Sequence, residues 1–418
     1  MTDARYLDFD LEIWREGDQY KAEVRQSPAG PSERVLLKWP FDYSDTEREN
    51  LLLRLENAVL KGRGRRSGPA STEEKVLREF GAEVFRAVLK ESESVGEKFR
   101  SSLDLVARDS DVAGLRVKLK VDPPELAALP WEYMFDESGR KDGSVPYLCL
   151  RNRSPILRFI GKKDAGGKVR TNGPLRILAM VANPGGEWAR LDTEAERRSI
   201  DDAWKAISNA AIELRWVPSG KLDDLQEMML LGPWHIFHFI GHGGTDLYAD
   251  TDGQMVSEGF VVMEDGAGGA AKVPAADLAL MFEGERHLRL AVLNCCESGR
   301  GTFSSAGAEL VRSGVSAAIA MQYAITNGAA ARFAGMFYKS LAAGLSVERA
   351  LTEARRHVRT QSDVEWGIPV LFARSDSSLA FDLSPATASP APAAPAVKPT
   401  NASIDRARAQ EELRRLFG

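Results

Sequence analysis

Apolar segments alternate with helical segments from Leu175 onward, and this alternation constrains the fold more than any other feature of the chain. The segment 175–184 is almost continuously apolar and ends at Asn183-Pro184, which is typical of a strand buried on both faces. Further strands are expected at 212–217, 235–242, 287–294, 315–321 and 368–372, with a hairpin around 259–265. Helices are expected between them, near 192–208, 222–230, 305–312, 328–343 and 346–360 and from Pro274. This spacing predicts an α/β fold with a mostly parallel sheet and helices on both faces.

The first part of the chain, 1–165, is predicted to form an α+β domain. Alternating apolar residues at 7–13 and 20–24 flank the turn at Gly17, which indicates a β-hairpin. Helical patterns follow at 45–61 and 72–90, and another strand pattern covers 115–121. The segment 161–173 is expected to be a linker to a second domain over 173–382.

The last residues have a different composition. Residues 383–403 are rich in proline and alanine, which predicts an extended linker rather than a packed segment. Residues 404–418 place Ala409, Leu413, Leu416 and Phe417 on one face at helical spacing. We expect a short amphipathic helix that becomes ordered against a partner protein, with a frayed terminus as the alternative.

Composition excludes several classes of function. The 418 residues carry a formal net charge of −5 and no basic stripe, which argues against direct nucleic-acid binding. The chain has three cysteines and begins without an apolar signal core, and no segment approaches the ~20 apolar residues of a membrane span. We therefore expect a cytoplasmic protein that does not bind membranes.

Two strand ends bring together the residue types of a thiol nucleophile and its base. One strand is expected to stop at Gly241-His242-Gly243-Gly244, and another at Asn294-Cys295-Cys296. If the strands are parallel neighbours, His242 and a cysteine emerge at the same sheet edge, where reactive groups of α/β sheets lie. The backbone N–H groups of Gly243 and Cys296 are the candidate oxyanion donors.

The adjacent cysteines are expected to differ in role. Successive residues of a strand face opposite sides, so Cys295 and Cys296 should not point the same way. Cys296 lies further past the strand, beside Glu297-Ser298-Gly299, and is expected to project into the crevice as the candidate nucleophile. Cys295 is expected to pack as a small apolar side chain. Cys149 is expected in a core. His235 and His238 would point to opposite faces of a strand, which argues against a shared metal ion. No metal or organic cofactor is expected.

Acidic residues near the same edge are candidates for a specificity pocket. Asp246, Asp265 and Glu297 could line it, and the alternative is that each is a solvated loop charge.

These sequence features together resemble a CHAT domain, a family of caspase-like cysteine peptidases related to separases and metacaspases. The resemblance rests on GHGG after one strand, LNCCESG after another, and the run 314–355. It covers roughly 175–375, and LPWEYMFDES and SPILRFI upstream resemble the segment that precedes many such domains. By position, the family's catalytic histidine corresponds to His242 and its cysteine to Cys296. Asn294 replaces the acidic residue of the metacaspase motif, so a preference for basic residues is not implied.

The resemblance implies an endopeptidase that cleaves a protein substrate, controlled by an activating or inhibitory protein in bacterial defence or cell death. Many relatives carry a tetratricopeptide array that this chain lacks, so control would involve residues 1–165 or the C-terminal helix. The main alternative is a catalytically silent interaction module with the same fold. A nucleotide-binding regulator is a weaker alternative, because no phosphate-binding loop is present: Gly266-Ala267-Gly268-Gly269 lacks the required Lys-Ser/Thr.

Overall fold

The computed structural model describes residues 5–38, 41, 43–64, 71–139, 145–164, 168–171, 173–186, 188, 194, 197–198, 200–202, 212–249, 255–295, 304–375 and 379–382. The strands are β1 (Arg5–Glu16), β2 (Gln19–Gln26), β3 (Val35–Leu37), β4 (Val112–Val121), β5 (Ile156–Asp164), β6 (Lys168–Arg170), β7 (Leu175–Val181), β8 (Ile212–Trp216), β9 (Ile236–Ala249), β10 (Met255–Glu264), β11 (Ala270–Pro274), β12 (Leu290–Cys295), β13 (Ala317–Met321), β14 (Pro369–Ser375) and β15 (Ala380–Asp382). The helices are α1 (Asp45–Lys61), α2 (Thr72–Phe85), α3 (Glu93–Arg108), α4 (Pro124–Ala127), α7 (Leu222–Met229), α8 (Ala275–Met281), α9 (Ser304–Ser313), α10 (Asn327–Ala342) and α11 (Val347–Arg359). Single turns lie at Arg86–Lys90, Trp131–Tyr133, Leu148–Leu150 and Glu365–Gly367.

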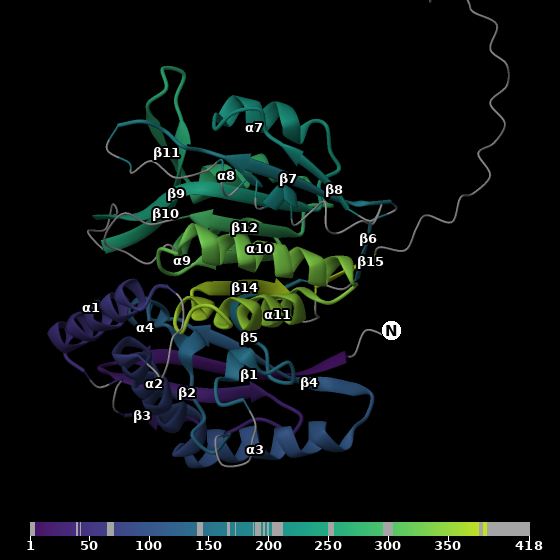
Figure 1. Cartoon of the computed structure of the whole chain (residues 1–418). Coiled ribbons are helices and arrows are strands. Elements are labelled where there is room, and N and C mark those ends of the chain that lie inside the picture. Colours follow the sequence, from purple (N-terminus) through teal and green to yellow (C-terminus); the bar gives the residue numbers. More distant parts are fainter. Residues whose placement is uncertain are drawn as a thin grey trace, which may run out of the picture.

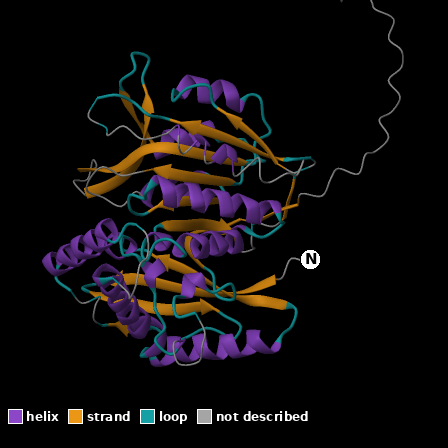
Figure 2. Cartoon of the chain, in the orientation of Figure 1, coloured by secondary structure: helices purple, strands orange, loops and turns teal. Residues whose placement is uncertain are grey.

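One sheet of 13 strands runs through most of these elements (Figures 1 and 2). Its C-terminal half consists of β8, β7, β9, β12 and β13, which are mutually parallel, and β10 and β11 extend it. Its N-terminal half consists of β5, β4 and β1, which are parallel to β14, and β2 and β3, which follow antiparallel. The two halves meet where β13 and β14 pair antiparallel. The predicted α/β class, with a mostly parallel sheet flanked by helices, is confirmed.

Helices cover both faces of the C-terminal half because its strands are apolar on both faces. Ala291 and Leu293 of β12 pack in a cluster with residues of α8 and α9. Leu290 and Val292 face the other cluster, to which α10 and α11 contribute. In Figure 1, α10 and α11 lie in front of the sheet. A strand buried on both faces reads as a continuous apolar run, which is why these segments could be predicted.

Several sequence predictions agree with the structure, whereas the predicted linker differs and one helix was missed. The hairpin at 7–24 corresponds to β1 and β2, which pair antiparallel, and the helix predicted at 45–61 is α1. The expected linker 161–173 is partly β-structure, since β5 runs to Asp164 and β6 pairs with β15. Helix α3 was not predicted. The division into domains at 165 and 173 stays a prediction, and the tail beyond 382 lies outside the described residues.

Candidate active site

Strands β9 and β12 are parallel neighbours, which is the condition under which His242 and a cysteine emerge at the same sheet edge. Their register pairs Leu290 with Ile236 and continues to Cys295, which pairs with Gly241. All six residues of β12 are buried. The residue after Gly241 is His242, and the residue after Cys295 is Cys296. The two candidate catalytic residues are therefore sequence neighbours of one cross-strand pair at the carboxyl edge of the parallel strands.

The expectation that β9 stops at Gly241 is wrong. The strand continues to Ala249, and from His242 onward its residues pair antiparallel with β10. His242 itself pairs with Val262. Glycine tolerates extended backbone as readily as turns, so a Gly-rich segment need not end a strand when a partner strand is present. His242 thus lies where β9 leaves its parallel pairing with β7 and β12 and begins to pair with β10.

His242 is 1% exposed and lies against an aromatic side chain. The ring of Trp188 lies 5.3 Å from the imidazole, centroid to centroid, with 37° between the planes. Trp188 also contacts Phe260 of β10 edge to face, at 6.3 Å between centroids. Neither Trp188 nor Phe260 was predicted to belong to the site. The available signal was the position of Trp188, seven residues beyond the carboxyl end of the buried strand β7.

Two glycines near His242 make room for aromatic rings. A Cβ atom on Gly244 would lie 2.8 Å from Cζ of Phe260, and one on Gly241 would lie 2.7 Å from Cζ of Phe239. Side-chain atoms do not pack so closely, and these glycines are explained by packing. Gly243 pairs with Val261 of β10, and its role as an oxyanion donor stays a prediction.

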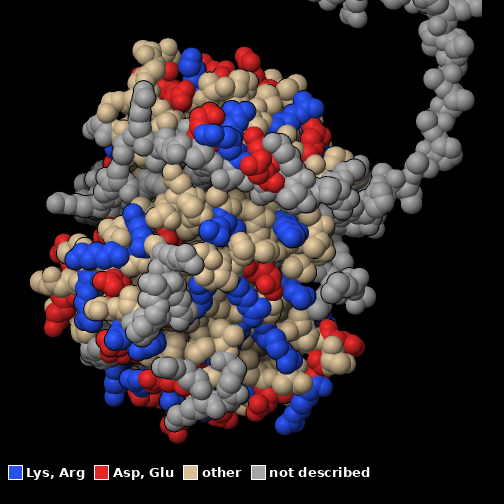
Figure 3. Space-filling view, viewed as in Figure 1, with Lys and Arg blue, Asp and Glu red and all other residues tan. Residues whose placement is uncertain are grey.

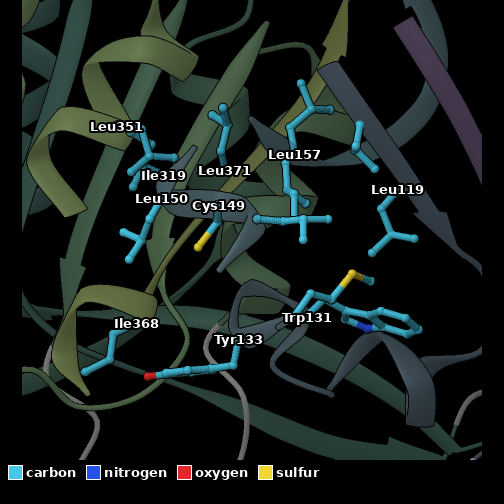
Figure 4. Close-up of a cluster of buried hydrophobic side chains, with 14 of the residues drawn as sticks. Leu119, Trp131, Tyr133, Cys149, Leu150, Leu157, Ile319, Leu351, Ile368 and Leu371 are labelled. Atoms are coloured by element: carbon cyan, nitrogen blue, oxygen red, sulfur yellow. The ribbon is translucent and has the colours of Figure 1, made fainter. Parts of the chain in front are cut away.

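The described cysteines are both buried. Cys295 belongs to the cluster packed under α8 and α9, as expected of an apolar side chain. Cys149 lies among Tyr133, Leu150 and Ile368 (Figure 4), and its Sγ donates to the Glu132 carbonyl at 2.9 Å. Burial raises the pKa of the Cys149 thiol to about 12, so it stays protonated and unreactive near neutral pH.

Cys296 and Glu297 lie outside the described residues, so their predicted roles as nucleophile and pocket residue stay predictions. The other two acidic candidates have partners of their own. Asp246 is paired with Lys272 at 2.8 Å. The Oδ1 atom of Asp265 accepts the N–H groups of Ala267 and Gly269 at 2.8 and 2.6 Å, which closes the turn between β10 and β11. The specificity pocket itself stays a prediction.

His235 and His238 have structural roles. The backbone N–H of Arg176 donates to Nδ1 of His235 at 2.9 Å, and Nδ1 of His238 lies 2.6 Å from the Tyr338 hydroxyl. Burial lowers the pKa of His238 to about 3; burial, with His287 and Arg176 nearby, lowers that of His235 to about 4. Both imidazoles are therefore neutral at pH 7. Within the described ranges, no group of three or more His, Cys, Asp or Glu side chains could hold a metal ion.

None of the described helices is long and apolar enough to cross a bilayer. Acidic and basic side chains are intermixed over the face shown in Figure 3.

Comparison with known proteins shows the family to which the chain belongs. The family model described as "CHAT domain" matches residues 103–399, which includes β4 and β5 as well as the C-terminal half of the sheet. A search of curated proteins returns no match. Among solved structures, the chain is similar to separase in the Saccharomyces cerevisiae separase–securin complex, with a TM-score of 0.43 and 11% identity. That alignment covers 90% of this chain and 30% of the separase chain. The family match spans well over half of the sequence, and the chain belongs to the CHAT domain family.

Proposed function

We propose that the protein is a cysteine endopeptidase in which Cys296 is the nucleophile and His242 the acid–base residue. One observation carries the proposal: Cys295 pairs with Gly241, so the residues that follow each of them, Cys296 and His242, are neighbours of the same cross-strand pair. A catalytic thiol and imidazole must lie within hydrogen-bond reach. The membership of the CHAT family supports the same assignment.

The proposed reaction is ordinary thiol acyl transfer. His242 takes the proton of Cys296, and the thiolate attacks the scissile carbonyl. The N–H groups of Gly243 and Cys296 stabilise the oxyanion. The imidazolium then protonates the leaving amine as the C–N bond breaks, and water hydrolyses the thioester and restores the thiol. The reaction uses no metal or organic cofactor, and it needs a reducing compartment such as the cytoplasm.

The surroundings of His242 indicate what the substrate meets next to the scissile bond. Trp188 and Phe260 form an aromatic wall, and Lys272 both pairs with Asp246 and lies 4.4 Å from the centroid of Phe260. The charges near this wall neutralise each other. A protein substrate with a large apolar side chain beside the cleaved bond fits it better than one with a charged side chain.

Control by a protein partner is part of the proposal. We place the protein in a bacterial defence or cell-death system, where a peptidase must stay inactive until a signal arrives. Residues 404–418 are the proposed docking segment because their apolar face needs a partner to become ordered.

The test uses three matched variants of the full chain. Cys296→Ala and His242→Ala should each abolish cleavage, identified by terminal-labelling proteomics of cells that express the active protein. Cys295→Ala is the matched control, one residue away, and should retain most activity because Cys295 is buried in the core. Cleavage by Cys296→Ala at the wild-type rate would disprove the assignment.

One observation favours the alternative, a catalytically silent interaction module. His242 is 1% exposed beneath Trp188, so the imidazole is covered. Labelling with a thiol-directed peptide electrophile separates the two functions. The peptidase is expected to be labelled at Cys296 and not at Cys295, whereas the interaction module would be labelled at neither, with or without a candidate activator.

A further inference from the structure

A row of polar residues crosses the opposite edge of the C-terminal half. The residues that precede β9, β12 and β13 are His235, Arg289 and Ser316, and Arg374 of β14 continues the row. Backbone hydrogen bonds join neighbouring residues of this row. The N–H of Arg289 donates to the His235 carbonyl at 3.0 Å, and the N–H of Arg374 donates to the Ser316 carbonyl at 3.3 Å. Arg289 and Arg374 therefore flank Ser316 on adjacent strands, with Cα atoms about 10 Å apart.

The arginine side chains line a cavity of about 330 Å³. Its walls are Arg286, Arg289 and Arg374 together with the turns that follow α8 and α9, at Gly284 and Gly314. Nη1 of Arg289 donates to Oγ of the buried Ser316 at 3.2 Å, which holds that guanidinium in place. Three arginines thus line one cavity, and its volume falls in the range of small-molecule sites.

Neither helix end requires these arginines. The N–H of Val315 donates to the Leu310 carbonyl at 3.1 Å, and the N–H of Glu283 donates to the Leu280 carbonyl at 3.1 Å, so backbone groups cap both helices. Two carboxylates, Glu283 and Glu285, also line the cavity. Among the described residues neither makes an ion pair. The lining carries three positive and two negative side chains, so its formal charge is positive.

We propose that this cavity, the arginine pocket, binds a small phosphorylated molecule. A planar carboxylate is satisfied by one guanidinium fork, whereas a phosphate group has enough oxygens to accept bonds from several arginines. The volume suits a phosphate with an attached group of nucleoside size and is too small for an extended polypeptide. The pocket lies at the start of β12, and Cys295 lies at its end, so the ligand would bind at the edge of the sheet opposite His242.

The test measures binding of inorganic phosphate, AMP and adenosine to the full chain by calorimetry at constant ionic strength, with chloride as the balancing anion. We expect AMP to bind, phosphate to bind more weakly, and adenosine not to bind. Arg289→Gln and Arg374→Gln should each weaken AMP binding by about tenfold or more, because each removes a charge-assisted hydrogen bond. The matched control is Arg54→Gln on α1, whose side chain is 61% exposed and distant in sequence from the pocket.

Circular dichroism establishes that each variant is folded. If Arg289→Gln does not fold, Arg286→Gln provides the same test from an exposed position in the lining. Equal binding of AMP by the pocket variants and the wild type would overturn the proposal. So would equal affinity for adenosine and AMP, or failure of both AMP and phosphate to bind the wild type.

Discussion

The two halves of the sheet differ in whether their central strands carry charged residues. In the N-terminal half, β1 and β4 place an acidic residue opposite a basic one at three successive positions on one face: Asp8 with Arg116, Asp10 with Lys118 and Glu12 with Lys120. We call these six residues the charge ladder. In the C-terminal half, all six residues of β12 are buried and none of them is charged. The first half gains specificity of pairing from charge, and the second gains stability from apolar burial.

The difference has an energetic consequence. Arg116 is 2% exposed, and its guanidinium contacts Asp8 at 2.7 Å and Glu348 of α11 at 2.9 Å. Such a buried network depends on every member, because removing one leaves the others charged and unpaired in a poorly solvated place. An apolar strand has no comparable dependence. Each loss in it costs only the contacts of the deleted atoms and the space they leave.

The largest expected effect follows from Arg116. We expect Arg116→Met to lower the free energy of unfolding by about 3–5 kcal/mol, because it removes the ion pair of the buried Glu348 and leaves Asp8 only its longer contact with Lys118, at 3.6 Å. The matched control is Arg215→Met in the C-terminal half. Its Nε lies 2.7 Å from Glu213, as Nε of Arg116 lies from Asp8, but its side chain is 54% exposed. We expect a loss of about 0–1 kcal/mol there. Urea denaturation measures the free energy of unfolding of both variants. Equal losses in the two variants would show that burial of the Arg116 ion pairs adds nothing to their effect on stability.

The next prediction concerns pH, which should affect the stability of the two halves of the sheet differently. His235 and His238 are neutral in the folded C-terminal half down to about pH 4 and pH 3, whereas the unfolded chain takes up protons below the ordinary pKa of 6.5. Stability is therefore lost as pH falls from 6.5 toward those values, by about 2 kcal/mol per histidine at pH 5. In the ladder, burial alone would raise the pKa of Glu12, but hydrogen bonds from Lys120 and Arg25 outweigh it and lower the pKa. That contribution is lost only below the ordinary pKa of 4.5.

Hydrogen exchange followed by mass spectrometry should detect this order. After correction for the intrinsic rates, peptides from β7, β9 and β12 should lose protection between pH 6.5 and pH 5, while peptides from β1 and β4 keep theirs. Loss of protection in β1 and β4 first, or in both halves together, would show that the buried histidines do not determine acid sensitivity.

How much the sequence predicts also differs between the halves. The C-terminal strands were predictable because a strand buried on both faces has an almost continuously apolar sequence. That the strands carrying His242 and Cys295 are neighbours could only be assumed from the sequence, because an apolar run does not give the order of strands in a sheet. The charge ladder was not predictable, since it requires knowing that β1 pairs with β4, more than 100 residues away. The aromatic wall was missed because contacts between Trp188, His242 and Phe260 join three separate segments. Local periodicity contains no information about such contacts.

The smallest expected effect concerns the extension that carries the candidate active site. Gly244→Ala places a methyl group 2.8 Å from the Phe260 ring, in a segment with no charge ladder to fix its register. Forcing the ring aside should cost about 1–3 kcal/mol of unfolding free energy. Gly266→Ala, in the nearby turn where nothing lies within 4 Å of the new atom, should change it by less than about 0.5 kcal/mol. Combining Gly244→Ala with Phe260→Ala separates strain from loss of flexibility. If the clash is the cause, the double variant is less destabilised than the sum of the single variants. Additive losses would mean that the destabilisation by Gly244→Ala comes from the backbone of β9 and not from a clash with the Phe260 ring.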